Sequence, residues 1–227
     1  MYLPASFRHG ASYPLLVVHD GGDFLQWAAA KTVLDNLIHR GDVAPTVAAF
    51  LHPKDRLTEY ADSAGHTRFL NDELLPRLTG EYALTGQRCL LGASFGAVAS
   101  LSAAVRSPSA YTSLILLSGS FVFTDGVVDH GGGPVFDPVV AFVNAYRHLP
   151  TRVAERLFLS CGVYEPLITR SRAMRTVFES TGMAVRYVEV RDGHTWENWR
   201  DRLRDALSWA IGPAPGGGSS RRQRAAG

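Results

Sequence analysis

Cysteine is scarce in this sequence of 227 residues, and so are long hydrophobic runs. The two cysteines, Cys89 and Cys161, cannot form a disulfide framework, and their spacing is not that of a metal site. We expect both to be inert thiols buried in strands. No run approaches the ~18 apolar residues of a transmembrane helix. The start, MYLPASFRHG, lacks the basic and apolar regions of a signal peptide. We therefore expect a cytoplasmic protein with no membrane partner.

Excess charge of either sign is also lacking. Lysine plus arginine number 23 and aspartate plus glutamate 21, a net charge of +2. Arg221, Arg222 and Arg224 lie near the end of the chain, so the rest is close to neutral and indicates no nucleic-acid partner. Only two lysines stand against 21 arginines. Because the arginines are scattered, we interpret this ratio as coding bias rather than phosphate recognition.

What the sequence does contain is short apolar runs alternating with amphipathic stretches. The runs, which we expect to be buried strands, span residues 13–19, 46–51, 88–91, 113–117, 156–160 and 184–190. The stretches with helical spacing span residues 27–38, 67–78, 97–105, 171–180 and 197–211. Strands that are apolar throughout and alternate with helices predict an α/β fold with a mainly parallel sheet covered on both faces. We expect one domain over 1–211 and a disordered Gly/Pro/Arg tail over 212–227.

The most specific motif is Gly92-Ala93-Ser94-Phe95-Gly96, which follows a predicted strand and precedes a predicted helix. This is the pattern of the nucleophile elbow, in which a serine hydroxyl stands exposed on a sharp turn above an α/β-hydrolase sheet. The following helix would point its free N–H groups at the same place, which favours a developing negative charge. The motif predicts Ser94 as a nucleophile. The competing interpretation is a glycine-rich turn that contains an incidental serine.

A serine nucleophile needs a base, and the base needs an orienting acid. On this fold the chain order is serine, acid, histidine, which favours His194, in the loop after the last strand. His19 ends the first strand and is the next candidate, although it precedes Ser94. Glu165 follows the strand at 156–160 and is the predicted acid. Asp192 is a rival, and aspartates 125, 129 and 137 remain open. The other histidines, at positions 9, 39, 52, 66, 130 and 148, are interpreted as surface or loop residues.

The oxyanion hole needs two backbone donors. One is the N–H of Phe95, directly after the nucleophile. The other is expected from the loop His19-Asp20-Gly21-Gly22-Asp23, whose glycines allow close backbone approach to a substrate. We favour the Asp23 N–H, with Gly22 second. The two aspartates of this loop have no further ligand set, so we expect turn and cap residues and neither a metal nor another cofactor.

These motifs together resemble the putative-esterase family of α/β-hydrolases, which contains enterochelin esterase and esterase D-like enzymes. The matching segments include HDGGDF, DRLTEY, FLNDELLPRL, GASFGAVAS, SGSF, CGVYE and GHTWENWR, and they run from Met1 to about Ile211. The resemblance implies an α/β-hydrolase fold and cleavage of carboxylic esters by a serine–histidine pair with a supporting acid. Iron-related members hydrolyse cyclic catecholate-siderophore lactones. In those members the arginine of the R-x-x-E segment, here Arg56, helps to contact the acidic substrate.

The substrate pocket is expected at the carboxyl ends of the strands. The long segment 122–150 contains Gly131-Gly132-Gly133-Pro134 and is interpreted as a lid able to move. Arg56 and Trp196 would place a cation and an aromatic face beside the pocket, which suits an aromatic or acidic small-molecule ester. The alternative is that Arg56 pairs with Glu59 and Trp196 packs under the last helix. A serine acyltransferase of the same fold and a non-catalytic binding protein remain the competing functions.

Overall fold

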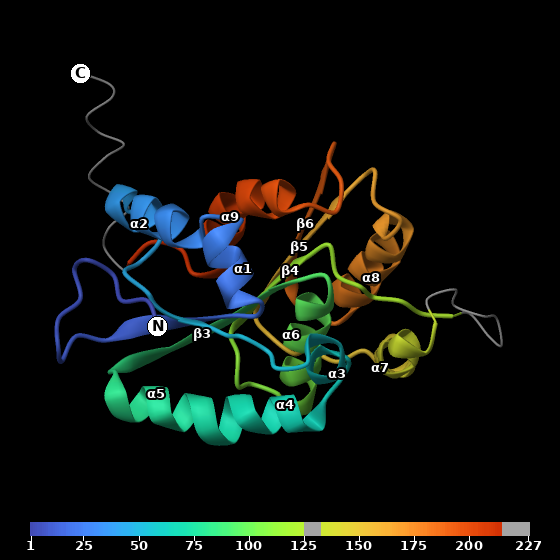
Figure 1. Ribbon diagram of the computed structural model, residues 1–227, viewed down its shortest axis with the longest axis horizontal. Helices are drawn as coiled ribbons and strands as arrows, with labels where there is room; N and C mark the ends of the chain where they lie inside the picture. Colours follow the sequence, from blue (N-terminus) through green and yellow to red (C-terminus); the bar gives the residue numbers. More distant parts are fainter. Residues whose placement is uncertain (125–132, 215–227) are drawn as a thin grey trace.

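The computed structural model describes residues 1–124 and 133–214, and its centre is a six-stranded sheet with strand order β2-β1-β3-β4-β5-β6 (Figure 1). All neighbouring strands pair in parallel. The strands are β1 (Tyr13–Val18), β2 (Val47–Phe50), β3 (Leu84–Ala93), β4 (Ser113–Leu117), β5 (Arg156–Gly162) and β6 (Ala184–Val190). The predicted mainly parallel α/β architecture is therefore confirmed.

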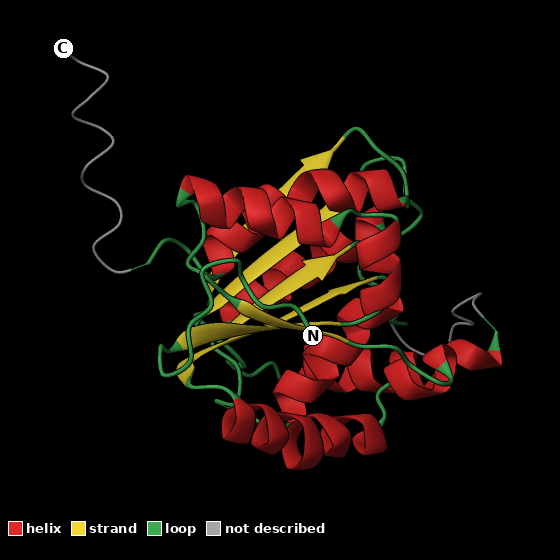
Figure 2. Cartoon of the chain, turned by 60° about the vertical axis from the view of Figure 1, so that its left-hand side comes forward, coloured by secondary structure: helices red, strands yellow, loops and turns green. Residues whose placement is uncertain are grey.

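Helices cover both faces of the sheet (Figures 1 and 2). One face carries α1 (Gly21–Gln26), α2 (Ala30–Arg40) and α9 (Trp196–Ala210). The other carries α3 (Arg56–Tyr60), α4 (Ala64–Arg68), the π-helical turn η1 (Phe69–Leu74), α5 (Leu75–Glu81), α6 (Phe95–Arg106), α7 (Asp137–His148) and α8 (Ile168–Ser180). A short 3₁₀ turn, η2 (Pro134–Phe136), leads into α7.

The sheet separates two hydrophobic cores. Along β1, Leu15 and Val17 pack into the core under α6, whereas Leu16 and Val18 pack into the core under α2 and α9. Successive side chains of a strand point to opposite faces, so a strand covered on both faces is apolar at every position. This burial explains the uninterrupted apolar runs of the sequence.

Several predicted helices differ from the structure. The helix predicted over 27–38 begins at Ala30, and the short α1 lies before it. The helix predicted over 67–78 is divided into α4, η1 and α5. Helices α3 and α7 were not predicted, because α3 is only five residues long and α7 follows a glycine-rich stretch. Much of the segment interpreted as a lid is thus helical.

Some predictions concern residues that the structure does not describe. Asp125, Asp129, His130 and most of the predicted tail lie outside the described residues. At the start of that tail, the carbonyl of Gly212 accepts a hydrogen bond from Ala44 N. Within the described ranges, no helix is both long and apolar enough to cross a membrane.

Candidate active site

The topology separates two loops at one edge of the sheet. After β1 the chain turns outward to β2, and β3 then starts the other half of the sheet on the opposite side of β1. The loops that follow β1 and β3 therefore leave the sheet in different directions, and ligands of open parallel sheets generally bind at such a switch point, beyond the carboxyl ends of the strands. The first loop carries Asp20 to Gly22 and the second carries Ser94.

Ser94 lies on a sharp turn between β3 and α6. Its backbone angles, φ 55° and ψ −120°, lie in a region that side-chain-bearing residues rarely adopt and that costs roughly 1–3 kcal/mol. A Cβ at Gly92 would collide with the backbone of Gly96, so the elbow needs glycine there. The Ser94 N–H donates to the carbonyl of Leu117 at 2.9 Å, which fixes the turn to β4. The hydroxyl-bearing residue is half-buried and remains accessible.

His194 and Glu165 lie together. Nδ1 of His194 is 2.7 Å from Oε2 of Glu165. A carboxylate can only accept from this nitrogen, so the contact places the imidazole proton on Nδ1 and leaves Nε2 free to act as a base. Glu165 is buried, whereas His194 is exposed. The two residues that sequence reasoning selected are therefore a pair in the structure.

Four donors surround the Glu165 carboxylate. Besides His194, it accepts hydrogen bonds from the Ser118 hydroxyl at 2.7 Å, the Gly162 N–H at 2.7 Å and the Asn198 amide at 3.3 Å. Burial raises the pKa of Glu165, but the hydrogen bonds from His194, Ser118 and Gly162 outweigh it, so the net pKa lies below its usual value. Glu165 is therefore held as a carboxylate.

Ser118 has a second contact, which ties this network to α9. Trp199 Nε1 donates to the Ser118 hydroxyl at 2.9 Å, and the His194 ring lies edge-on to Trp199 with 5.0 Å between centroids. Sequence reasoning noted the Ser118-Gly119-Ser120 segment only as part of the family resemblance. The hydrogen bonds of Ser118 join it to Glu165 and Trp199, which lie far away in the chain.

Another hydroxyl lies beside the nucleophile. Ser94 Oγ and Ser120 Oγ are 3.0 Å apart, and the Ser120 N–H donates to the carbonyl of Ser94 at 3.1 Å. Within the described part of the chain, no hydrogen bond joins Ser94 Oγ to His194. In this resting arrangement the nucleophile is hydrogen bonded to another serine.

The predicted oxyanion donors lie at the starts of two helices. Phe95 is the first residue of α6, and Gly22 and Asp23 lie in the first turn of α1. The first N–H groups of a helix have no partner within the helix. The ring of His52 covers Gly22, where any Cβ would collide with it. His52 was predicted as a surface or loop residue, and it is exposed.

Arg56 is paired with Asp20. Its Nε and Nη2 each lie 2.8 Å from one carboxylate oxygen of Asp20, which is 3% exposed. The alternative pairing with Glu59 is wrong, because Glu59 instead accepts from the backbone N–H groups of Lys54 and Asp55. A role of Arg56 in substrate binding stays a prediction.

Trp196 is the first residue of α9 and stands edge-on to Phe24 of α1 and to Trp199, at 5.2 and 4.7 Å between centroids. It packs against the core on that face of the sheet and is partly buried. Directly after the nucleophile, the ring of Phe95 lies 5.0 Å from that of Phe136. A role of Trp196 in substrate binding stays a prediction.

His19, the second candidate base, is engaged elsewhere. It is fully buried, with Nδ1 3.0 Å from the Ser100 hydroxyl and Nε2 2.9 Å from Nε2 of His66. Ser100 donates its proton to the carbonyl of Gly96. Ser100 must then accept from His19 Nδ1, and His66 must donate to His19 Nε2. The prediction that His66 is a surface or loop residue is wrong, because it is buried in α4.

The remaining candidates have other positions or contacts. Asp192 accepts a hydrogen bond from Gly193 N, and Asp137 begins α7. Both cysteines are buried, and burial raises the pKa of each thiol to about 12. Among the described residues, no group of three or more histidine, cysteine, aspartate or glutamate side chains is arranged to hold a metal ion.

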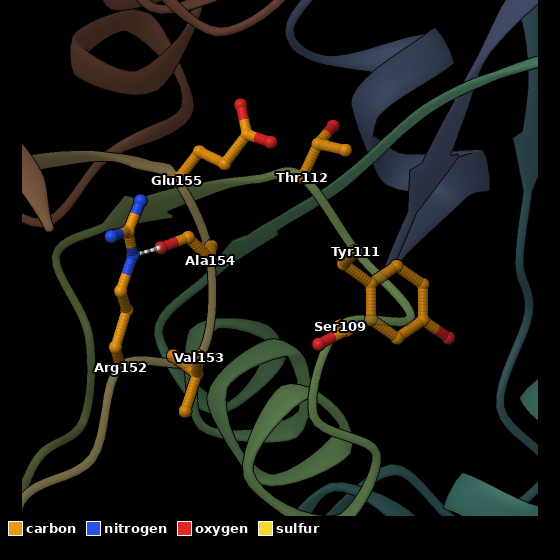
Figure 3. A pocket seen from close by; sticks show the side chains of 7 residues that line it. All are labelled: Ser109, Tyr111, Thr112, Arg152, Val153, Ala154 and Glu155. Carbon is orange, nitrogen blue, oxygen red and sulfur yellow. Dashed lines mark hydrogen bonds between the residues drawn. The ribbon is translucent and has the colours of Figure 1, made fainter.

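A hollow of about 270 Å³ opens at the opposite edge of the sheet (Figure 3). It lies where β4 and β5 begin and is lined by Thr112, Glu155 and Arg152, which donates to the carbonyl of Ala154. Because the strands are parallel, this edge is remote from Ser94, and the hollow is no part of the candidate active site.

A wholly parallel sheet, a serine on a strand-to-helix turn and a histidine–glutamate pair at the same edge define an α/β-hydrolase. A family model described as "Putative esterase" matches residues 1–210. The chain therefore belongs to this esterase family.

The chain is also similar to known proteins in sequence or fold. The iron(III) enterobactin esterase of Escherichia coli is 25% identical over 86% of this chain and 48% of its own length. The ferric enterobactin esterase structure from Salmonella typhimurium aligns with a TM-score of 0.76 at 20% identity, over 92% of this chain and 53% of that one. A ferulic acid esterase aligns with a TM-score of 0.69 at 18% identity, over 89% and 86%. The chain thus spans about half the length of the enterobactin esterases that it matches.

Proposed function

We propose that this chain is a serine carboxylic-ester hydrolase that works through an acyl-enzyme on Ser94. The observation that carries the proposal is the 2.7 Å contact between His194 and Glu165, at the same edge of the sheet as the elbow. Ser94 would be the nucleophile, His194 the general base and Glu165 the acid that orients it. The family membership supports ester hydrolysis over a purely binding function.

The reaction would proceed in two halves. Ser94 Oγ attacks the ester carbonyl while its proton passes to His194 Nε2, and the carbonyl oxygen becomes an oxyanion. The N–H of Phe95, with that of Asp23 or Gly22, would stabilise this charge. The C–O bond of the ester then breaks, and the alcohol leaves with the proton from His194. Water releases the acyl group by the same steps in reverse order.

Aromatic or acidic esters, including siderophore-type esters, are the proposed substrates. Two partly exposed rings support this class: Phe136, which packs against Phe95 next to the nucleophile, and Trp196, two residues after His194. Arg56, although paired with Asp20, keeps a partly exposed guanidinium, whose carbon is 5.8 Å from the ring centroid of Phe95. The E. coli relative is named for an enterobactin ester, which supports the same class.

The test compares kcat/KM for a catecholate or aryl-carboxylate ester with that for a long-chain fatty ester. Wild type should prefer the first ester, and Arg56→Ala should reduce this preference about tenfold or more, as expected for loss of a charge-assisted contact. The ratio is independent of the folded fraction, because both esters meet the same enzyme. Preference for the fatty ester, or an unchanged ratio in Arg56→Ala, would refute the substrate class while leaving the esterase proposal intact.

A further inference from the structure

We infer that Ser120 is a second catalytic serine, whose hydroxyl donates a hydrogen bond to Ser94 Oγ and assists that oxygen when it leaves the acyl group. The inference rests on the acyl-enzyme proposed above and adds a residue to its second half. It starts from the 3.0 Å distance between the two hydroxyl oxygens.

The position of Ser120 is fixed by its surroundings. It is 4% exposed, its N–H donates to the carbonyl of Ser94, and its own carbonyl accepts from Val122 N at 2.8 Å. Next to it, Gly119 lies so close to the ring of Phe121 that a Cβ there would collide with that ring. Phe121 itself is fully buried. The Ser120 hydroxyl is therefore presented to the nucleophile by packed backbone.

The direction of this hydrogen bond follows from the number of protons. A serine hydroxyl carries one proton, and the proton of Ser94 must pass to His194 for attack. The productive arrangement therefore has Ser120 as donor and Ser94 Oγ as acceptor. In the described part of the chain, Ser94 Oγ is the only hydrogen-bond partner of the Ser120 hydroxyl, so its proton is available for this purpose.

Such a donor helps the two half-reactions unequally. In acylation, Ser94 Oγ is the nucleophile, and a donor that stabilises its lone pair also reduces its reactivity. In deacylation, water attacks the acyl carbon and gives its proton to His194 Nε2. The C–Oγ bond then breaks, its electron pair goes to Ser94 Oγ, and His194 returns the proton to that oxygen. A hydrogen bond strengthens as its acceptor gains negative charge, so Ser120 stabilises this leaving oxygen while keeping its own proton.

The test measures the acylation and deacylation rate constants separately, by stopped-flow and by mass spectrometry of the acyl-enzyme, with an activated aryl ester. Ser120→Ala should reduce deacylation about 10–100-fold and leave acylation within about threefold, so that acyl-enzyme accumulates at one per site. Ser120→Thr, which retains a hydroxyl, should keep deacylation within about fivefold of wild type. Ser113→Ala is the matched control, since Ser113 is equally buried at the other end of β4 and should leave both rate constants unchanged.

The outcomes separate this inference from the proposed function. If wild type forms an acyl-enzyme on Ser94 but Ser120→Ala reduces both rate constants equally or neither, the role of Ser120 is refuted and the esterase mechanism stands. If Ser120→Ala does not fold, Ser120→Gly, which also removes the hydroxyl, takes its place, and equal losses of acylation and deacylation in that variant would refute the inference. If wild type forms no acyl-enzyme on Ser94, both proposals fall together.

Discussion

Oε2 of Glu165 accepts the Nδ1 proton of His194 at 2.7 Å, across 29 positions of sequence. The same carboxylate is buried and is held by Ser118, Gly162 and Asn198. An imidazole bound in this way has one tautomer and one orientation, with Nε2 free of its proton and able to act as a base. The loops after β4, β5 and β6 thus act together on one imidazole.

This pairing predicts an order of effects among three substitutions. His194→Ala should reduce kcat nearly as much as loss of Ser94, roughly 10⁶-fold, because the triad acts as a unit. Glu165→Ala should reduce kcat less, roughly 10⁴-fold, since the imidazole is still present without its orienting acid. Asp192→Ala should remain close to wild type, because Asp192 contacts Gly193 N and not the imidazole. Steady-state kinetics with an aryl ester gives the order, and an inactive Asp192→Ala beside an active Glu165→Ala would overturn the acid assignment.

The buried Asp20 carboxylate predicts a stability effect of Arg56. Arg56→Met would leave Asp20 without its bidentate partner, which should lower the free energy of unfolding by about 2–3 kcal/mol, the lower end for buried pairs because Arg56 is partly exposed. The double variant Asp20→Asn/Arg56→Met should recover part of this loss. Urea unfolding of the two single variants and the double variant measures the coupling. Strictly additive losses would show that the pair contributes no stability.

The buried histidine pair predicts loss of stability in acid. Burial, together with the nearby His66 and Arg56, lowers the pKa of His19 to about 3, and burial lowers that of His66 against the opposing charge of Glu59. Below a pH of ~6.5 the two histidines bind protons in the unfolded chain but not in the native state. Stability is therefore complete above about pH 6.5 and falls with decreasing pH by up to about 1.4 kcal/mol per unit for each histidine.

Substitution of His66 tests this account. His66→Gln removes one titrating group, so the difference in unfolding free energy between pH 7.5 and pH 5.0 should become smaller than in wild type. His39→Gln, at an exposed site in α2, is the control and should leave the difference unchanged. An equal pH dependence in wild type and His66→Gln would contradict the assignment.

The elbow glycine predicts a contrast between two similar substitutions. Gly92→Ala forces a methyl group into the backbone of Gly96 and should destabilise the fold or displace the elbow, with loss of activity. Gly80→Ala, in open space within α5, should instead stabilise the protein by about 0.5–1 kcal/mol. Thermal unfolding and activity of both variants provide the measurement. A fully active, stable Gly92→Ala protein would show that the elbow is not tightly packed.

The positions of the six strands and of the elbow could be predicted from the sequence, because apolar runs and the G-x-S-x-G motif are local signals. Chain order on this fold favoured His194 and Glu165, while Asp192 and three other aspartates stayed open as the acid. The hydrogen bonds of Ser118, Ser120 and His66 could not be predicted in this way. Each joins residues far apart in sequence, such as Ser94 with Ser120 or His19 with His66, and isolated serines and histidines have no periodicity.

The interpretation of Arg56 shows the same limit. From the sequence alone, a charged residue in a loop can be predicted equally well as a substrate contact or as the ion-pair partner of a near neighbour. The actual partner, Asp20, lies 36 positions away and is brought close only because β1 and β2 are adjacent in the sheet. Partner choice over such distances depends on the tertiary fold.

The most direct test of the account is covalent labelling of the nucleophile. A fluorophosphonate reacts with activated serines, and peptide mass spectrometry locates the adduct. We predict one adduct per chain, on Ser94, in wild type, together with no adduct and no aryl-ester hydrolysis above background in a folded Ser94→Ala protein. Retention of full hydrolytic activity by Ser94→Ala, or an adduct on another residue in wild type, would contradict the proposed mechanism.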